Sequence, residues 1–165
     1  MAKIKYCLHC GEELSVKNIN GKTYLACSSN NREYVHWDNP IPVVAAIVEH
    51  QGNIILARNK KWSPRMFGLI TGFLEKGESP EKAIIREVKE ELNLDARLEI
   101  MIGVYPYPEQ NQLFIVYHMT ADGEIRIGEE LAEVISSPPE KLRPWPLGTG
   151  LAVKEWLEKR GLKAS

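Results

Sequence analysis

The sequence contains no long apolar run and has almost no net charge. No stretch approaches the ~18 uninterrupted apolar residues of a membrane-spanning helix, and the first residues, MAKIKYCLHCGEELSV, do not contain the apolar run of a signal peptide. We therefore expect no membrane partner. Lys and Arg number 21 against 22 Asp and Glu, giving a net charge of −1. The chain as a whole thus has no bias toward nucleic acid, and we expect no nucleic-acid partner.

Cysteine is also scarce. The chain has three cysteines, which cannot all pair with one another, and two of them form the Cys-x-x-Cys of Cys7 and Cys10. This usage is unlike a secreted disulfide scaffold and favours a reducing, cytoplasmic location.

Composition changes near residue 39. Residues 1–38 hold all the cysteines and few apolar residues beyond the strand-like TYLAC, whereas an apolar run, VVAAIVEH, begins at residue 43. Pro40 and Pro42 between them discourage helix and ladder pairing. We predict a small module over 1–38 and a main domain over 39–165.

The main domain alternates strand and helix signals without a regular βαβ repeat, which predicts an α+β layered fold. β-Branched and large apolar residues predict strands at 43–49, 53–58, 68–74, 97–105 and 112–120, with a short strand at 124–127. One helix is predicted from the N-cap Ser79 to Leu92, closed by Asn93, and a second over about 149–160.

The first predicted helix gathers its negative charge on one face. Glu87, Glu90 and Glu91 share that face beside the small Ala83, while Arg86 can pair with Glu90 at i, i+4. The core-facing positions are predicted to be Ile84, Ile85, Val88 and Leu92. Such a face is either an ordinary solvated surface or a site for a hard divalent cation, and the spacing alone leaves both open.

A longer pattern surrounds this helix, in GFLEKGESPEKAIIREVKEELNL. It has Gly, five residues, Glu, seven residues, Arg-Glu-apolar, one residue and Glu-Glu. One residue later, Asn93 stands where a glycine is expected. The pattern strongly resembles the signature of the Nudix hydrolase family. The resemblance implies the Nudix fold, an α/β/α sandwich in which mixed β-sheet layers lie between helices. The matching positions are Gly72, Glu78, Arg86, Glu87, Val88, Glu90 and Glu91.

The resemblance also implies an activity: hydrolysis, with Mg²⁺ or Mn²⁺, of the diphosphate in a nucleoside diphosphate linked to another moiety. The implied metal ligands are Glu87 and Glu91, with Glu90 as a further ligand or a base. Further residues, in the helix and outside it, are implied in other roles. Arg86 would orient the glutamates, Glu78 would brace the loop, Gly72 would let the backbone approach the site, and Glu130 would add an acidic ligand. For Arg86 and Glu78 a purely structural role is an equal alternative.

The N-terminal module resembles the zinc ribbon of the NADH pyrophosphatase branch of this family. Cys7, Cys10 and Cys27 would bind Zn²⁺, but Asn30 stands where a fourth cysteine is expected. Either His36 or His9 would complete the site, and His36 is the better candidate because His9 lies between Cys7 and Cys10, where simultaneous ligation is awkward. The alternative is a ribbon that persists without tightly bound metal.

Aromatic residues outside the signature are candidates for stacking on a base or ribose, although core or rim packing is the alternative. They are Trp62, Phe67, Tyr105 and Tyr107. The segment VYPYPEQNQL lacks the Ser-Gln and Trp of the branch motif, so the substrate stays open between NADH, ADP-ribose, an oxidised nucleoside triphosphate or another nucleotide derivative. A non-catalytic nucleotide sensor and a ribbon that serves as an interaction module are the readings from other classes. The resemblance further implies a homodimer.

Overall fold

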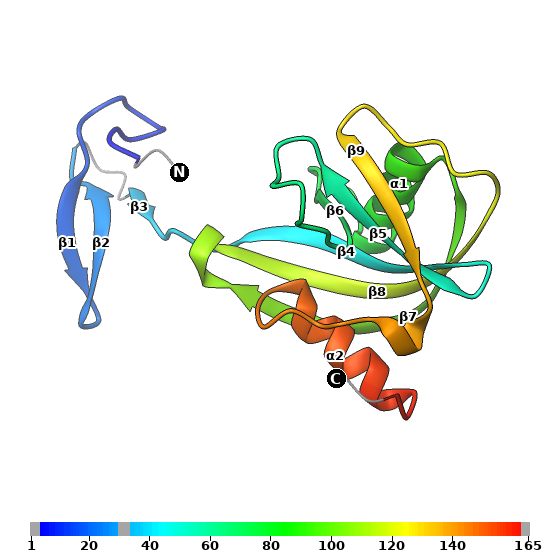
Figure 1. Cartoon of the computed structure of the whole chain (residues 1–165). Helices are drawn as coiled ribbons and strands as arrows, with labels where there is room; N and C mark the ends of the chain where they lie inside the picture. The colour runs from blue at the N-terminus through cyan, green and yellow to red at the C-terminus, as the bar shows by residue number, and fades with distance from the viewer. Residues whose placement is uncertain (1–3, 30–33, 163–165) are drawn as a thin grey trace. The chain divides into compact units, whose positions relative to one another are not determined.

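The computed structural model describes residues 4–29 and 34–162 (Figure 1). The chain divides into two compact units at Pro40, close to the predicted boundary. Among the described residues, no helix is long and apolar enough to cross a membrane.

The first unit is a three-stranded antiparallel sheet in the order β1-β2-β3. The strands are β1 (Ser15–Ile19), β2 (Lys22–Cys27) and β3 (Tyr34–His36), of which only β2 was predicted. Asn20 and Gly21 both have positive φ and form the tight turn between β1 and β2. Among the residues described in this unit, the buried ones are Cys7, Leu14, Ala26 and Cys27.

The second unit is built on a six-stranded mixed sheet in the order β7-β8-β4-β5-β9, with β6 also paired to β4. β4 runs parallel to β8 and antiparallel to β5 and β6. The strands are β4 (Ile41–His50), β5 (Asn53–Asn59), β6 (Ile70–Phe73), β7 (Asp95–Tyr107), β8 (Gln112–Asp122) and β9 (Leu131–Ser137). The helices are α1 (Pro80–Leu92) and α2 (Thr149–Lys159), with short 3₁₀ turns at Pro108–Gln110 and Pro139–Lys141.

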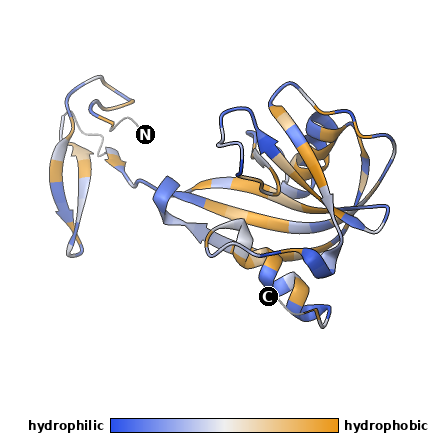
Figure 2. Cartoon of the chain, viewed as in Figure 1, coloured by the Kyte–Doolittle hydropathy of each residue, from blue (hydrophilic) through white to orange (hydrophobic). Residues whose placement is uncertain are grey.

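The two helices cover opposite faces of the sheet (Figure 1). In β4, Val44, Ala46 and Val48 pack in the cluster that contains the apolar side of α1. Val43, Ala45 and Ile47 alternate with them and pack in the cluster that contains α2. Because both faces are covered, β4 is almost continuously apolar, as Figure 2 shows. The predicted α+β sandwich is confirmed.

Helix α1 has the predicted ends. The Ser79 side chain accepts a hydrogen bond from the Lys82 N–H, and Pro80 occupies the first turn. Asn93 has φ 59°, and its N–H donates to the Lys89 carbonyl at 2.9 Å. The left-handed cap that the missing glycine would supply is therefore provided by asparagine.

The buried face of α1 is shifted from the predicted one. Ile85 is 40% exposed, whereas Ala83 is fully buried, so the prediction that Ile85 faces the core was wrong. At about 100° per residue, the arc from Ala83 to Leu92 also contains the positions of Glu87 and Glu91. Two of the acidic side chains thus emerge from the buried side of the helix. On α2, Leu151 is exposed and Val153 is buried.

The predicted strand at 124–127 was also wrong, and β9 was not predicted. Residues 124–128 form no strand; they run against the end of α1 instead. The Arg126 N–H donates to the Leu92 carbonyl at 3.0 Å, and the Gly128 N–H donates to the Glu91 carbonyl at 2.8 Å. These bonds satisfy carbonyls that a helix C-terminus leaves free, and they bring the following loop beside the glutamates.

Candidate active site

Arg86 connects the acidic face of α1 to the loop before it. Its Nε and Nη2 donate to the two carboxylate oxygens of Glu78 at 3.1 and 3.0 Å. Its Nη1 donates to Glu87 at 2.7 Å and to Glu90 at 3.1 Å, and its Nη2 reaches the Phe73 carbonyl at 3.3 Å. The forked pair lowers the pKa of Glu78, and the surrounding carboxylates raise that of Arg86. The predicted i, i+4 pair with Glu90 is present.

Gly72 on β6 lies directly beneath Glu87. A Cβ at residue 72 would stand 1.8 Å from the Glu87 Cδ and 2.3 Å from its Cγ. Glu87 itself is well covered, with 14% of its side chain exposed. Burial raises its pKa, against the opposing effect of Arg86. Glycine is therefore required at residue 72 for the carboxylate to keep this position.

Glu91 is the most perturbed carboxyl group of the site. Burial, followed by the charges of Glu87, Glu130 and Glu90, raises its pKa to about 8. None of the hydrogen bonds or ion pairs among the described residues involves the Glu91 side chain. A partly buried acid surrounded by like charges, with no protein donor, is a position that a cation would stabilise.

These acidic groups line a cleft of about 710 Å³. Glu130 lines it from the loop that precedes β9, which is bonded to the C-terminal end of α1 through the Gly128 N–H. That loop is fixed to the end of β5, since the Lys60 N–H donates to the Glu130 carbonyl at 3.0 Å. The acidic residues that line the cleft are Glu75, Glu87, Glu90, Glu91, Glu129 and Glu130. The sequence analysis did not identify Glu75, although it belongs to the same signature loop, or Glu129.

An adjoining hollow of about 420 Å³ is apolar and aromatic. Trp62 and Tyr107 line both the cleft and the hollow, whereas Phe67 lines the hollow and not the cleft. Phe114 forms a stacked pair with Tyr107 at a centroid distance of 5.8 Å. The hollow is also lined by Trp145, from the loop before α2, and by Thr149, the first residue of α2.

Tyr105 lines neither space. Its hydroxyl donates to Glu155 of α2 at 2.5 Å, and burial together with this contact raises its pKa. The structure thus brings Trp62, Phe67 and Tyr107 together and places Tyr105 beneath the helix.

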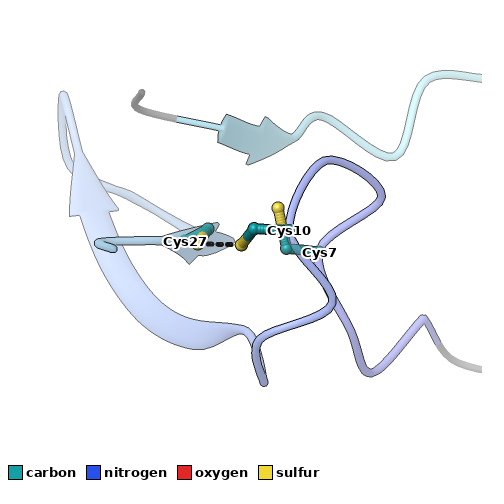
Figure 3. Close-up of side chains that lie close together, drawn as sticks. All are labelled: Cys7, Cys10 and Cys27. Carbon is teal, nitrogen blue, oxygen red and sulfur yellow. Dashed lines mark hydrogen bonds between the residues drawn. The ribbon is translucent and has the colours of Figure 1, made fainter. Parts of the chain in front are cut away.

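A second candidate site lies in the N-terminal unit. The Sγ atoms of Cys7, Cys10 and Cys27 all lie within 4.8 Å of one another. Cys7 and Cys10 come from one loop and Cys27 from the end of β2, and Figure 3 shows the Cys10 sulfur directed at Cys27. Within the described residues, no other group of three potential metal-ligating side chains of this kind converges so closely; the carboxylates of the cleft are spread more widely.

The predicted fourth ligand is not among them. His36 on β3 has its Nε2 3.8 Å from the Asp38 carboxylate and does not join the cysteine group. Asn30, the residue at the expected fourth cysteine position, lies outside the described residues.

Comparison with known proteins identifies the class that this fold and site define. The model of the NUDIX domain matches residues 39–157, and the chain belongs to that family, as predicted. It is 39% identical over 83 residues to an NAD-capped RNA hydrolase NudC of Mycobacterium bovis, a match that covers 49% of this chain and 26% of the relative. The chain thus spans only about a quarter of that relative.

Two further matches cover more of the chain. An ADP-ribose pyrophosphatase of Methanocaldococcus jannaschii is 29% identical over 142 residues, which cover 81% of this chain and 83% of that protein. The crystal structure of a NUDIX hydrolase from Nitrosomonas europaea superposes with a TM-score of 0.77 at 23% identity, over 98% of this chain and 96% of the other. The latter likeness establishes the fold.

Proposed function

We propose that the chain is a divalent-metal-dependent pyrophosphohydrolase that cleaves the diphosphate of a nucleotide derivative such as NADH or ADP-ribose. The observation that carries the proposal is the environment of Glu91. Its carboxyl group lines a cleft, is raised in pKa by burial and by the charges of three neighbouring carboxylates, and receives no hydrogen bond from the described residues. Repulsion among the carboxylates and burial of a carboxyl group without a partner both lower the stability of the folded protein. We therefore infer that a bound ligand is the reason for the arrangement.

The donor set fits Mg²⁺ or Mn²⁺. Glu87, Glu90, Glu91 and Glu130 offer hard oxygen donors, which these ions prefer, and they come from two separate elements that converge on one cleft. When bound, such an ion neutralises the diphosphate and makes a water molecule a better nucleophile. A cation beside Glu91 also favours the ionised form of that carboxyl group.

The protein's own contribution is to fix the carboxylates. Arg86 holds Glu87 and Glu90 by charged hydrogen bonds while it is itself held by Glu78. Gly72 provides the space that Glu87 fills. Glu90 is more exposed than Glu87 and Glu91, with 59% of its side chain accessible to solvent. Although Arg86 holds one of its oxygens, Glu90 lines the cleft and is the candidate for the general base that takes a proton from water.

The aromatic hollow beside the acidic cleft suits the uncharged ring of a nucleotide. Trp62, Phe67 and Tyr107 present apolar rings next to the place where the diphosphate would be bound. Stacking on such rings stabilises any base, so it supports a nucleotide derivative without selecting one. The names of the relatives suggest ADP-ribose and an NAD-linked group as the first candidates. The homodimer stays a prediction.

A product screen tests the proposal. The full chain is incubated with Mg²⁺ and NADH, NAD⁺, ADP-ribose, nucleotide sugars, an NAD-capped RNA or oxidised nucleoside triphosphates, and the products are identified by mass spectrometry. We expect one class to yield two monophosphates, with no reaction in excess EDTA. Release of pyrophosphate from a triphosphate would move the assignment to the alternative substrate class. Binding of a nucleotide without any turnover across the panel would favour the sensor.

A further inference from the structure

The cysteine cluster has a fourth polar neighbour that the sequence pattern did not indicate. The Ser29 Oγ lies 3.0 Å from the Cys27 Sγ and 3.4 Å from the Cys10 Sγ. The two sulfur atoms are themselves 3.5 Å apart. The three atoms therefore form a closed triangle in which each contacts the other two.

This triangle has the dimensions of one face of a tetrahedral metal site. With Zn–S bonds of ≈ 2.3 Å and Zn–O bonds of ≈ 2.0 Å, tetrahedral angles separate two sulfur ligands by about 3.8 Å and a sulfur from an oxygen by about 3.5 Å. The observed separations differ from these values by about half an ångström or less. The Cys7 sulfur, within 4.8 Å of the other two, is available for the remaining corner.

The backbone around the first two cysteines forms a tight turn. The His9 N–H points at the Cys7 sulfur, at 3.4 Å, and the Gly11 N–H donates to the Cys7 carbonyl at 2.9 Å. Gly11 has φ +77°, which glycine adopts without strain. Cys7 and Cys27 also pack with Leu14 in the small core of this unit, so packing holds their side chains in place.

We propose that this cluster binds Zn²⁺ through the thiolates of Cys7, Cys10 and Cys27 and the hydroxyl oxygen of Ser29, as a site with three sulfur ligands and one oxygen. On binding, three thiols release their protons to solvent and the Ser29 hydroxyl stays neutral. The loaded site carries one negative charge fewer than a four-thiolate ribbon. The inference concerns the N-terminal unit alone and does not depend on the proposed hydrolase activity.

The sharpest test is a gain of ligand. The full-length chain and its Ser29→Cys variant are loaded with Zn²⁺, and the sulfur ligands are counted by X-ray absorption at the zinc edge. We expect three sulfurs and one lighter atom in the wild type, and four sulfurs with tighter binding in Ser29→Cys. If the variant still shows three sulfurs, Ser29 does not occupy a ligand position and the proposal is overturned.

A loss-of-ligand series complements this measurement. Ser29→Ala is compared with Ser28→Ala, its neighbouring and exposed control, in competition with a chromophoric chelator. We expect Ser29→Ala to weaken zinc binding on the order of 10- to 100-fold, the range seen when groups that support a metal site are removed, and Ser28→Ala to leave it unchanged. Equal affinities for the two variants would contradict the proposal. A loss in His36→Ala without one in Ser29→Ala would assign the fourth ligand to His36.

Discussion

Gly72 and Glu87 are in a contact that only glycine permits, since a Cβ at residue 72 would lie 1.8 Å from the Glu87 Cδ. The Gly72→Ala variant must therefore push the carboxylate out of its place against β6. We expect turnover to fall on the order of 10²-fold, the cost of misplacing a catalytic group by about an ångström. Steady-state kinetics with Mg²⁺ measures this loss.

A double-mutant cycle shows whether the loss acts through Glu87. The Glu87→Ala variant removes the clashing carboxyl group, so adding Gly72→Ala to it should cost little more. Additive losses would mean that Gly72 matters for another reason, such as the pairing of β6 with β4.

Glu91→Gln separates activity from stability. The change keeps the shape of the side chain but removes its charge, and we expect turnover to fall by about 10²–10⁴-fold. In the metal-free protein above pH 8 the melting temperature should rise, because the ionised group is disfavoured by burial and by Glu87, Glu130 and Glu90. Kinetics and thermal unfolding in EDTA measure the two effects. Wild-type turnover in this variant would remove Glu91 from the catalytic account.

Trp62 and Tyr105 should behave differently if the aromatic hollow holds the base. Trp62 lines both spaces, so Trp62→Ala should raise KM by roughly 5- to 150-fold, equivalent to ~1–3 kcal/mol of stacking. Tyr105→Phe removes only the hydrogen bond to Glu155 and should leave KM unchanged while lowering stability by about 1 kcal/mol. A KM that responds to Tyr105→Phe and not to Trp62→Ala would place the base elsewhere.

His118 makes folding stability depend on pH. Burial lowers its pKa below the usual 6.5, although its Nε2 is 3.0 Å from Glu49, which also accepts from Arg160. Between the lowered pKa of His118 in the folded protein and its usual value in the unfolded chain, the unfolded chain binds one proton more. The stability contributed by neutral His118 is therefore complete above about pH 6.5 and is lost as the pH falls below that value. Urea unfolding from pH 7.5 to 5 should show a shallower decline for His118→Gln than for the wild type. Parallel declines in the two proteins would show that other groups dominate.

Local signals predicted the parts of the fold and site that depend on neighbouring residues. Ser79, Pro80 and Asn93 set the ends of α1 by their own backbone chemistry, and the spacing of Arg86 and Glu90 placed them in contact. The signature loop likewise predicted a glycine close to the acidic face, which Gly72 provides.

The sequence could not predict what depends on distant partners. Residues 124–128 look like a strand, but their N–H groups bond to the end of α1, which no local pattern encodes. Tyr105 and Tyr107 have the same local signal, and only the position of α2 separates a covered ring from one beside the hollow. Ser29 contacts the Cys10 sulfur although the two residues are 19 positions apart, and no local pattern encodes such a contact.

The central claim is that the carboxylates of the cleft form a cation site, and Mn²⁺ binding to the full chain tests it without knowledge of the substrate. Free Mn²⁺ is followed by electron paramagnetic resonance during titration of the wild type, Glu91→Gln and the control Glu109→Gln, an exposed acid that does not line the cleft. The account predicts bound Mn²⁺ in the wild type and in Glu109→Gln, and much weaker binding in Glu91→Gln. Equal binding by all three proteins would contradict it.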